Sequence, residues 1–320
     1  MPRTARQHAQ RRAEIRRRRL VAGAALASVL LLAFFLVRGF GAAGETGILV
    51  LTDGDRTLQR VSLVGLTRDG ELDESRLRRT LESVLPTSTT VTRGRARITY
   101  RYDRAATITR ALRRGREGGR VGVARQAVSA SVQTPILRQA QANTCESAAL
   151  SILLGALGRP TDQTELQRAL PTSGPLDPQS EGDARVWGDP DRGYVGRPDG
   201  GGVAGGFGVL QGPIQATARR YGVALRDITG ASAAAVYTHL LAGRPVMAWV
   251  GLSDGPYGSW TSPEGRRVRV NFGEHTVVLY GVRSDGQLLV SNPLEGTDEV
   301  WPRSKFELMW KRLDRRALAA

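Results

Sequence analysis

An uncharged run of 18 residues near the N-terminus constrains this chain more than any other feature. Residues 20–37 read LVAGAALASVLLLAFFLV, and a helix of that length measures about 27 Å, close to the thickness of a bilayer's hydrocarbon core. The preceding residues, 1–19, contain eight arginines and a single acid. Because positively charged flanks remain in the cytoplasm, the sequence predicts a cytoplasmic Arg-rich tail over 1–19, a transmembrane signal anchor over 20–37 and an extracytoplasmic remainder.

A cleaved signal peptide is the alternative interpretation of the same segment. The small residues at 41–44 (Gly-Ala-Ala-Gly) could serve as a cleavage site. The apolar run, however, is longer than the apolar part of an ordinary signal peptide, and Arg38 follows it directly. We therefore expect an uncleaved anchor and a single-pass protein of the cell membrane.

The formal net charge of +16 could suggest a nucleic-acid partner. Its distribution argues against that interpretation, because the segment 1–19 carries +7 of it as a topological signal. Only two lysines are present, Lys305 and Lys311, so the remaining positive charge consists almost entirely of arginines scattered among acids. We expect membrane contact through 20–37 and no nucleic-acid binding.

The extracytoplasmic part divides into three segments by composition. Residues 45–103 show strand patterns at 47–51 and 58–64 and a helix pattern capped by Asp73, which predicts a small α+β spacer or binding unit. Residues 104–132 are rich in Arg and Gly and predict a short helix that leads into a flexible linker. A larger second domain is expected over 133–320.

The single cysteine excludes an intrachain disulfide framework and any zinc site made of cysteines alone, and we expect neither a metal nor a cofactor. Cys145 begins an apolar helix pattern that Asn143 or Thr144 can cap and Gly158 can end. A thiol in the first turn of a helix lies near unpaired N–H groups, which favour the thiolate. The position predicts a pKa lowered from about 8.5 and a candidate nucleophile.

A nucleophilic thiol needs a base, and the chain has three histidines: His8, His239 and His275. The first lies in the predicted cytoplasmic tail and the second in an amphipathic helix pattern. His275 opens an apolar strand pattern, and the next strand pattern ends at Asn292, whose side chain could orient the imidazole.

An oxyanion also needs donors. Gln139, six residues before Cys145, could supply one together with the Cys145 backbone N–H, and Gln141 and Gln133 are alternatives for the same role.

With these residues in place, the chain from about residue 133 to its C-terminus resembles the bacterial C39-like cysteine peptidases, a papain-like family. The resemblance is carried in order by Asn-Thr-Cys145-Glu, by Gly-Glu-His275 and by Ser-Asn292-Pro-Leu, with matching glycine-rich segments between them. It implies an α+β, papain-like fold in which a helix that carries the cysteine packs on an antiparallel sheet that carries the histidine and its partner. The chain departs from the family at Asn292, where Asp is common.

The resemblance implies a membrane-anchored cysteine peptidase or amide hydrolase that acts on a peptide or protein substrate. Cys145, His275, Asn292 and Gln139 would form its catalytic site. Two alternatives remain open from the sequence. The domain could be a catalytically inactive papain-like binding module, or the same triad could transfer the acyl group to an amine as a transpeptidase.

Overall fold

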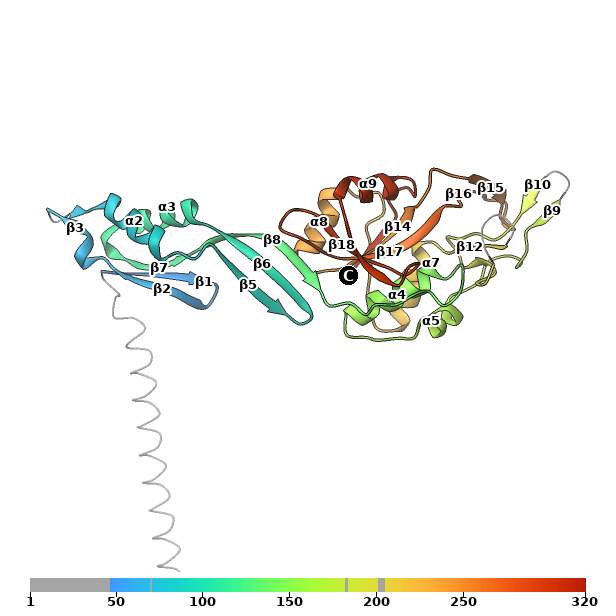
Figure 1. Ribbon diagram of the computed structural model, residues 1–320, viewed down its shortest axis with the longest axis horizontal. Helices are drawn as coiled ribbons and strands as arrows, with labels where there is room; N and C mark the ends of the chain where they lie inside the picture. Colours follow the sequence, from blue (N-terminus) through green and yellow to red (C-terminus); the bar gives the residue numbers. More distant parts are fainter. Residues whose placement is uncertain (1–46, 70, 182–183, 201–204) are drawn as a thin grey trace, which may run out of the picture. The chain divides into compact units, whose positions relative to one another are not determined.

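The computed structural model describes residues 47–320 except 70, 182–183 and 201–204. The predicted tail over 1–19 and the predicted anchor over 20–37 lie outside the described residues. Within the described part of the chain, no helix combines the length and the apolar character needed to cross a membrane. The chain forms two compact units (Figure 1). The first contains the described part of Met1–Leu85 with Asp103–Ala124, and the second contains Pro86–Tyr102 with Arg125–Ala320.

The first unit is a three-stranded sheet in the order β2-β1-β7, with two helices packed on it. β1 (Ile48–Asp53) pairs antiparallel with β2 (Arg56–Ser62) and parallel with β7 (Gly119–Gly122). Both helices begin at an aspartate whose side chain accepts a backbone N–H, Asp73 for α2 (Glu74–Val84) and Asp103 for α3 (Arg104–Arg114). The remaining elements are η1 (Val64–Leu66), β3 (Thr67–Arg68), β4 (Glu71–Leu72) and η2 (Gly115–Glu117).

The second unit is organised by a large sheet whose strands follow the order β13-β20-β14-β17-β8-β6-β5, with β18 and β19 continuing from β17. The central strand β17 (Glu274–Val282) pairs antiparallel with β14 (Val246–Gly251) on one side and with β18 (Leu288–Asn292) on the other. The other strands are β5 (Ser88–Arg93), β6 (Ala96–Asp103), β8 (Ala124–Val132), β13 (Arg226–Asp227), β19 (Thr297–Trp301) and β20 (Ala317–Ala319).

Helices cover both faces of the β14–β17 part of this sheet. On one face, α4 (Cys145–Ala156) and α7 (Gln211–Arg220) share a core with Met247, Trp249 and Val278. On the other face, α8 (Ala233–Leu241) and α9 (Arg303–Lys311) share a core with the alternate residues Ala248 and Val277. All twelve residues of α4 are buried, which explains its almost uniformly apolar and small composition. α5 (Gln163–Ala169) packs beside α4.

Two smaller sheets complete the second unit. One contains β9 (Gln179–Glu181), β10 (Ala184–Val186), β15 (Tyr257–Thr261) and β16 (Arg267–Asn271), and the other pairs β11 (Val195–Gly196) with β12 (Gly206–Gly208). Trp187, Trp249 and Trp260 are buried core residues, and the indole N–H of each donates to a backbone carbonyl.

The structure divides the chain differently from the sequence prediction. Residues 45–103 are not one unit, because the hairpin β5–β6 joins the large sheet of the second unit. The prediction of a flexible linker over 104–132 is wrong beyond its initial helix, because the chain continues through η2 into β7 and β8. The glycine signal had another cause. Gly118 has φ +70°, and a Cβ there would overlap the backbone of Ile48, so glycine permits a close approach between segments.

Candidate active site

The candidate site is built around the first turn of α4, where Cys145 is the only cysteine of the chain and is 5% exposed. Thr144 stands at the N-cap position, but its hydroxyl bonds to Gln141 in the preceding loop instead of capping the helix. The first N–H groups of α4 are therefore not capped by that side chain. Cys145 is the first residue of α4, so the thiol belongs to the first turn as the sequence predicted, but the predicted side-chain cap is absent.

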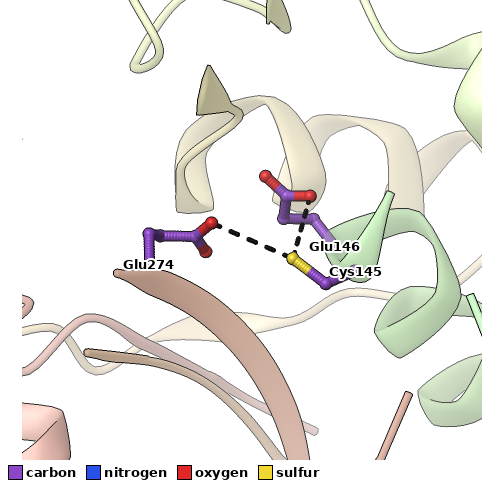
Figure 2. Close-up of side chains that lie close together, drawn as sticks. All are labelled: Cys145, Glu146 and Glu274. Atoms are coloured by element: carbon purple, nitrogen blue, oxygen red, sulfur yellow. Dashed lines mark hydrogen bonds between the residues drawn. The ribbon is translucent and has the colours of Figure 1, made fainter. Parts of the chain in front are cut away.

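Two carboxyl groups face the sulfur (Figure 2). The Cys145 thiol lies 3.3 Å from Glu146 Oε2 and 3.9 Å from Glu274 Oε2, both within the range of a hydrogen bond to sulfur. Burial raises the pKa of Cys145 well above its ordinary value, and the two carboxyl charges raise it further, while a backbone hydrogen bond from Thr276 lowers it. The prediction of a lowered pKa is thus wrong for the resting structure, because burial, and then the two carboxyl groups, raise the pKa of the thiol.

Glu146 is fixed in place by the loop that precedes α7. Its Oε1 accepts the backbone N–H of Val209 at 2.6 Å, and Gly208 leaves no room for a side chain beside it. Burial raises the pKa of Glu146 to about 7 against the opposing effect of that hydrogen bond. The residue therefore ties the nucleophile-bearing helix to the β12–α7 loop.

Glu274 reaches the sulfur from the first position of β17. Its Oε1 accepts the Thr276 hydroxyl at 3.0 Å, which leaves Oε2 directed toward Cys145. Burial, and then the charge of Glu146, raise the pKa of Glu274 well above its ordinary value. Sequence reasoning assigned no role to either acid. The available signal was adjacency, since each stands next to a predicted catalytic residue.

The structure brings His275 and Asn292 together across the β17–β18 pair. His275 Nε2 lies 2.8 Å from Asn292 Oδ1, and Asn292 Nδ2 donates to Glu299 Oε1 at 2.6 Å. Glu299 in turn accepts the indole N–H of Trp301. Burial lowers the pKa of His275 to about 4, so the resting imidazole is neutral at pH 7.

In the described part of the chain, His275 bonds directly to Asn292, but it has no such direct bond to the nucleophile. Among the described residues, no hydrogen bond joins Cys145 to His275. The two residues that flank His275, namely Glu274 and Thr276, both interact with the Cys145 thiol. The start of β17 therefore meets the start of α4, but the resting thiol is paired with carboxyl groups.

Gln139 is bound to the loop before the nucleophile. Its side-chain NH₂ donates to the backbone carbonyls of Gln141 and Ala142, while its buried Oε1 has no partner. Its backbone N–H donates to the carbonyl of Pro293, next to Asn292. Of the alternatives, Gln141 lies in the same loop. Gln133 follows β8, and its backbone N–H donates to the carbonyl of Arg95.

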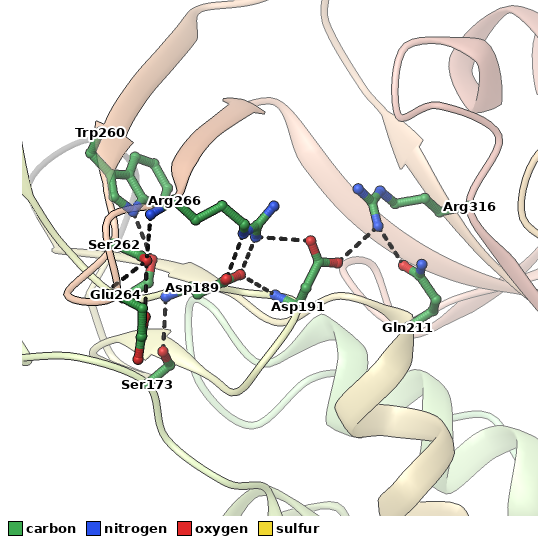
Figure 3. Close-up of polar contacts among 10 residues, drawn as sticks. Ser173, Asp189, Asp191, Gln211, Trp260, Ser262, Glu264, Arg266 and Arg316 are labelled. Atoms are coloured by element: carbon green, nitrogen blue, oxygen red, sulfur yellow. Dashed lines mark hydrogen bonds and ion pairs between the residues drawn. The ribbon is translucent and has the colours of Figure 1, made fainter.

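A charged network joins several loops of the second unit (Figure 3). Arg266 forms a bidentate ion pair with buried Asp189 and also contacts Asp191, which in turn binds Arg316 at 3.0 Å. Arg316 donates further to Gln211 at the start of α7. These contacts link the β10–β11 segment to the β15–β16 hairpin and to the C-terminal segment. Gln211 stands two residues after Val209, whose backbone N–H binds Glu146, so the network reaches the loop that holds this carboxyl.

Within the described residues, one group of three acidic or thiol side chains lies close enough together to hold a cation, and it is at the nucleophile itself. The sulfur of Cys145 and one oxygen each of Glu146 and Glu274 lie within 4.8 Å of one another. These atoms are engaged with one another and with Val209 and Thr276, and we assign no metal to them.

Comparison with known proteins shows the family to which the second unit is similar. Residues 131–318 match the model of the Peptidase_C39 like family. The chain belongs to this family. A relative, the uncharacterized protein YvpB of Bacillus subtilis (strain 168), is 29% identical over 180 residues, which are 55% of this chain and 68% of YvpB.

A crystal structure from Bacillus anthracis, described as that of a C39-like peptidase, is 26% identical with a TM-score of 0.50. The match covers 58% of this chain and 92% of that one. The likeness to the Bacillus anthracis structure agrees with the mixed α+β fold of the second unit. Neither relative's name states a substrate.

Proposed function

We propose that the second unit is a cysteine peptidase or related amide hydrolase with Cys145 as nucleophile. The observation that supports this most strongly is the meeting of two elements. The first turn of α4 presents the thiol, and the first residues of β17 present His275 already paired with Asn292. A thiol, a neutral imidazole and an amide that orients it are the groups that acyl transfer through a thioester requires.

In the proposed reaction the Cys145 thiol gives its proton to the neutral imidazole of His275, and the thiolate attacks the substrate carbonyl to form a tetrahedral intermediate. His275 returns that proton to the leaving amine as the C–N bond breaks, and Asn292 keeps the ring in the required tautomer and orientation. The backbone N–H of Cys145 and the side-chain NH₂ of Gln139 stabilise the oxyanion, the latter after it exchanges its present carbonyl partners for the substrate. Water then releases the acyl group from the sulfur.

A cavity of about 290 Å³ is lined by residues of β12, β15, β16 and the C-terminal segment, and we propose that it receives a substrate side chain. Phe207 and Asn271 are among its lining residues. Phe207 precedes Gly208, which packs against Glu146, and Asn271 lies three residues before Glu274. Further lining residues are charged, namely Arg269, Arg312, Asp314 and Arg316.

The nucleophile is tested by capturing the acyl-enzyme. Incubation of the full chain with a peptide mixture, followed by rapid acid quenching and intact mass spectrometry, is expected to show an acyl adduct on Cys145 and new peptide termini. Cys145→Ala should lose both, because no other cysteine can replace the nucleophile. Peptide cleavage that persists in Cys145→Ala would refute the proposal. An adduct that releases only onto an added amine would favour acyl transfer over hydrolysis.

We also propose that residues 20–37 anchor the protein so that this unit lies outside the cytoplasm. The support comes from the sequence, where the apolar run follows the Arg-rich segment. Protease added to intact cells is then expected to degrade the second unit while residues 1–19 stay protected. Sequencing of the mature protein provides the check, since an N-terminus near Gly44 would show cleavage and contradict the anchor.

A further inference from the structure

The imidazole of His275 begins a row of hydrogen bonds that passes through Asn292 and reaches the carboxyl group of Glu299. His275 Nε2 lies 2.8 Å from Asn292 Oδ1, and Asn292 Nδ2 lies 2.6 Å from Glu299 Oε1. The indole N–H of Trp301 donates to the other carboxyl oxygen, Oε2, at 2.6 Å. Val290 stands opposite Glu299 in the antiparallel β18–β19 pair, so Asn292, two residues further on, has its side chain on the same face of the sheet.

The far end of this row fixes the direction of each hydrogen bond in it. The indole of Trp301 can only donate, and an ionised carboxylate can only accept. Burial opposes the ionisation of Glu299, but its two hydrogen bonds and the nearby Lys305 lower its pKa below the ordinary value. Glu299 is therefore an acceptor at neutral pH, and the Asn292 group that faces it is the amide NH₂.

The orientation of the Asn292 amide determines which nitrogen of His275 carries the proton. With its NH₂ on Glu299, the amide turns Oδ1 toward the imidazole, and the backbone N–H of Leu294 donates to the same oxygen at 3.1 Å. A carbonyl oxygen can only accept, so the neutral ring holds its proton on Nε2. Nδ1 then keeps the lone pair that the proposed reaction needs for the Cys145 proton.

Asn292 and Glu299 match each other, so that neither can change alone without a conflict. Asn292→Asp would remove the N–H and place two carboxylates side by side, where like charges repel. Glu299→Gln would present one oxygen and one NH₂ to two donors, the indole of Trp301 and the amide of Asn292, so one donor would face another. Both changes together restore the match, because the indole donates to the new amide and the new amide donates to the new carboxylate.

We propose that Glu299 is a positioning residue, which fixes the amide of Asn292 and thereby the proton-bearing nitrogen of His275. Its polar contacts in the described part of the chain are with Asn292, Trp301 and Lys305, so it acts through the amide and not on the thiol. Burial lowers the pKa of His275, and the charge of Glu299 opposes that effect. The inference rests on the proposed function in that it takes the imidazole as the acceptor of the thiol proton.

The test reads the tautomer of His275 from the ¹⁵N shifts of the labelled ring at pH 7, in the full chain held in detergent micelles. The loss of one signal in His275→Ala separates it from His8 and His239. The parent chain should show the Nε2–H form alone. In Glu299→Gln a second population with the proton on Nδ1 should appear, because the Asn292 amide no longer has one satisfied orientation. Asn292→Asp/Glu299→Gln should return the ring to the Nε2–H form, and recovery by a second substitution excludes damage to the fold as the cause.

Asp298→Asn is the matched control, since it removes one negative charge from the neighbouring residue of β19. The Asp298 carboxyl bonds to hydroxyl groups of β17 and β18 and should leave the Nε2–H form unchanged when it is neutralised. A mixed tautomer in Asp298→Asn would show that any charge lost from this strand is sufficient. An unmixed tautomer in Glu299→Gln would show that the Leu294 N–H orients Asn292 by itself. Either result overturns the proposal.

Peptide cleavage gives a second reading, in which the sign of the Glu299→Gln effect depends on residue 292. In the parent chain, kcat/KM for a peptide identified by mass spectrometry should fall about tenfold or more, which corresponds to one lost hydrogen bond to a charged group. In Asn292→Asp the same change should raise kcat/KM, because it replaces a repelling carboxylate by a donor. A loss in both backgrounds overturns the proposal, since a residue that only supports the fold would lower activity in each.

The tautomer is measured without a peptide, so the two proposals can fail separately. A chain that cleaves no peptide but shows the mixed tautomer in Glu299→Gln, and not in Asp298→Asn, would refute the peptidase and support Glu299 as the residue that positions the ring. Peptide cleavage combined with an unmixed tautomer in Glu299→Gln would support the peptidase and overturn the role of Glu299.

Discussion

Replacement of His275 by alanine is expected to lower kcat/KM for peptide cleavage by about 10²–10⁴-fold, the usual contribution of a positioned acid–base group. The imidazole is neutral at rest, with a pKa of about 4, and can take up a proton only as the reaction develops charge beside it. Without it, the amine must leave unprotonated, so acylation should slow. The measurement is kcat/KM with a peptide identified by mass spectrometry.

His239 provides the matched control, because it is the other histidine among the described residues. It lies on α8, and its Nδ1 has no hydrogen-bond partner. His239→Ala should leave kcat/KM within about twofold. If His275→Ala and His239→Ala lose activity equally, or if neither does, His275 has no special part in the reaction. The same conclusion would follow if the acyl adduct on Cys145 formed at the same rate in His275→Ala as in the parent chain.

The sequence contained enough information to place α4 and the β17–β18 hairpin. The apolar run after Cys145 and the two strand patterns that end at Asn292 are local signals, and each element forms close to its expected position. The pairing of His275 with Asn292 follows from the antiparallel register of two strands joined by a short connection. Such contacts are close in sequence and are therefore predictable from it.

The surroundings of the sulfur could not be predicted in the same way. Glu274 is 129 residues from Cys145, and which side chain meets the thiol depends on how β17 packs on α4. A helix N-terminus lowers a thiol pKa and burial raises it, and only the packed structure shows which effect is larger. The assignment of the β5–β6 hairpin to the large sheet is similarly non-local. Its alternating pattern predicts a strand but not the strand's partner.

Gly208→Ala should produce a large loss of stability next to the site. The residue has φ +102°, which L side chains rarely adopt, and a Cβ there would overlap Glu146 Oε1. Backbone strain and overpacking each cost about 1–3 kcal/mol, so we expect the free energy of unfolding to fall by about 3–5 kcal/mol. Urea unfolding followed by tryptophan fluorescence measures the change, because Trp249 donates a hydrogen bond to the adjacent Val209.

Gly222→Ala separates the two contributions. Gly222 also has a positive φ, +76°, but a Cβ there meets nothing within 4 Å. Backbone strain alone should therefore lower the free energy of unfolding, by about 1–2 kcal/mol. The excess in Gly208→Ala then measures how firmly Glu146 is held against the β12–α7 loop. Equal losses in the two variants would mean that Glu146 can move aside at little cost. A movable Glu146 could not be the contact that ties the first turn of α4 to the β12–α7 loop.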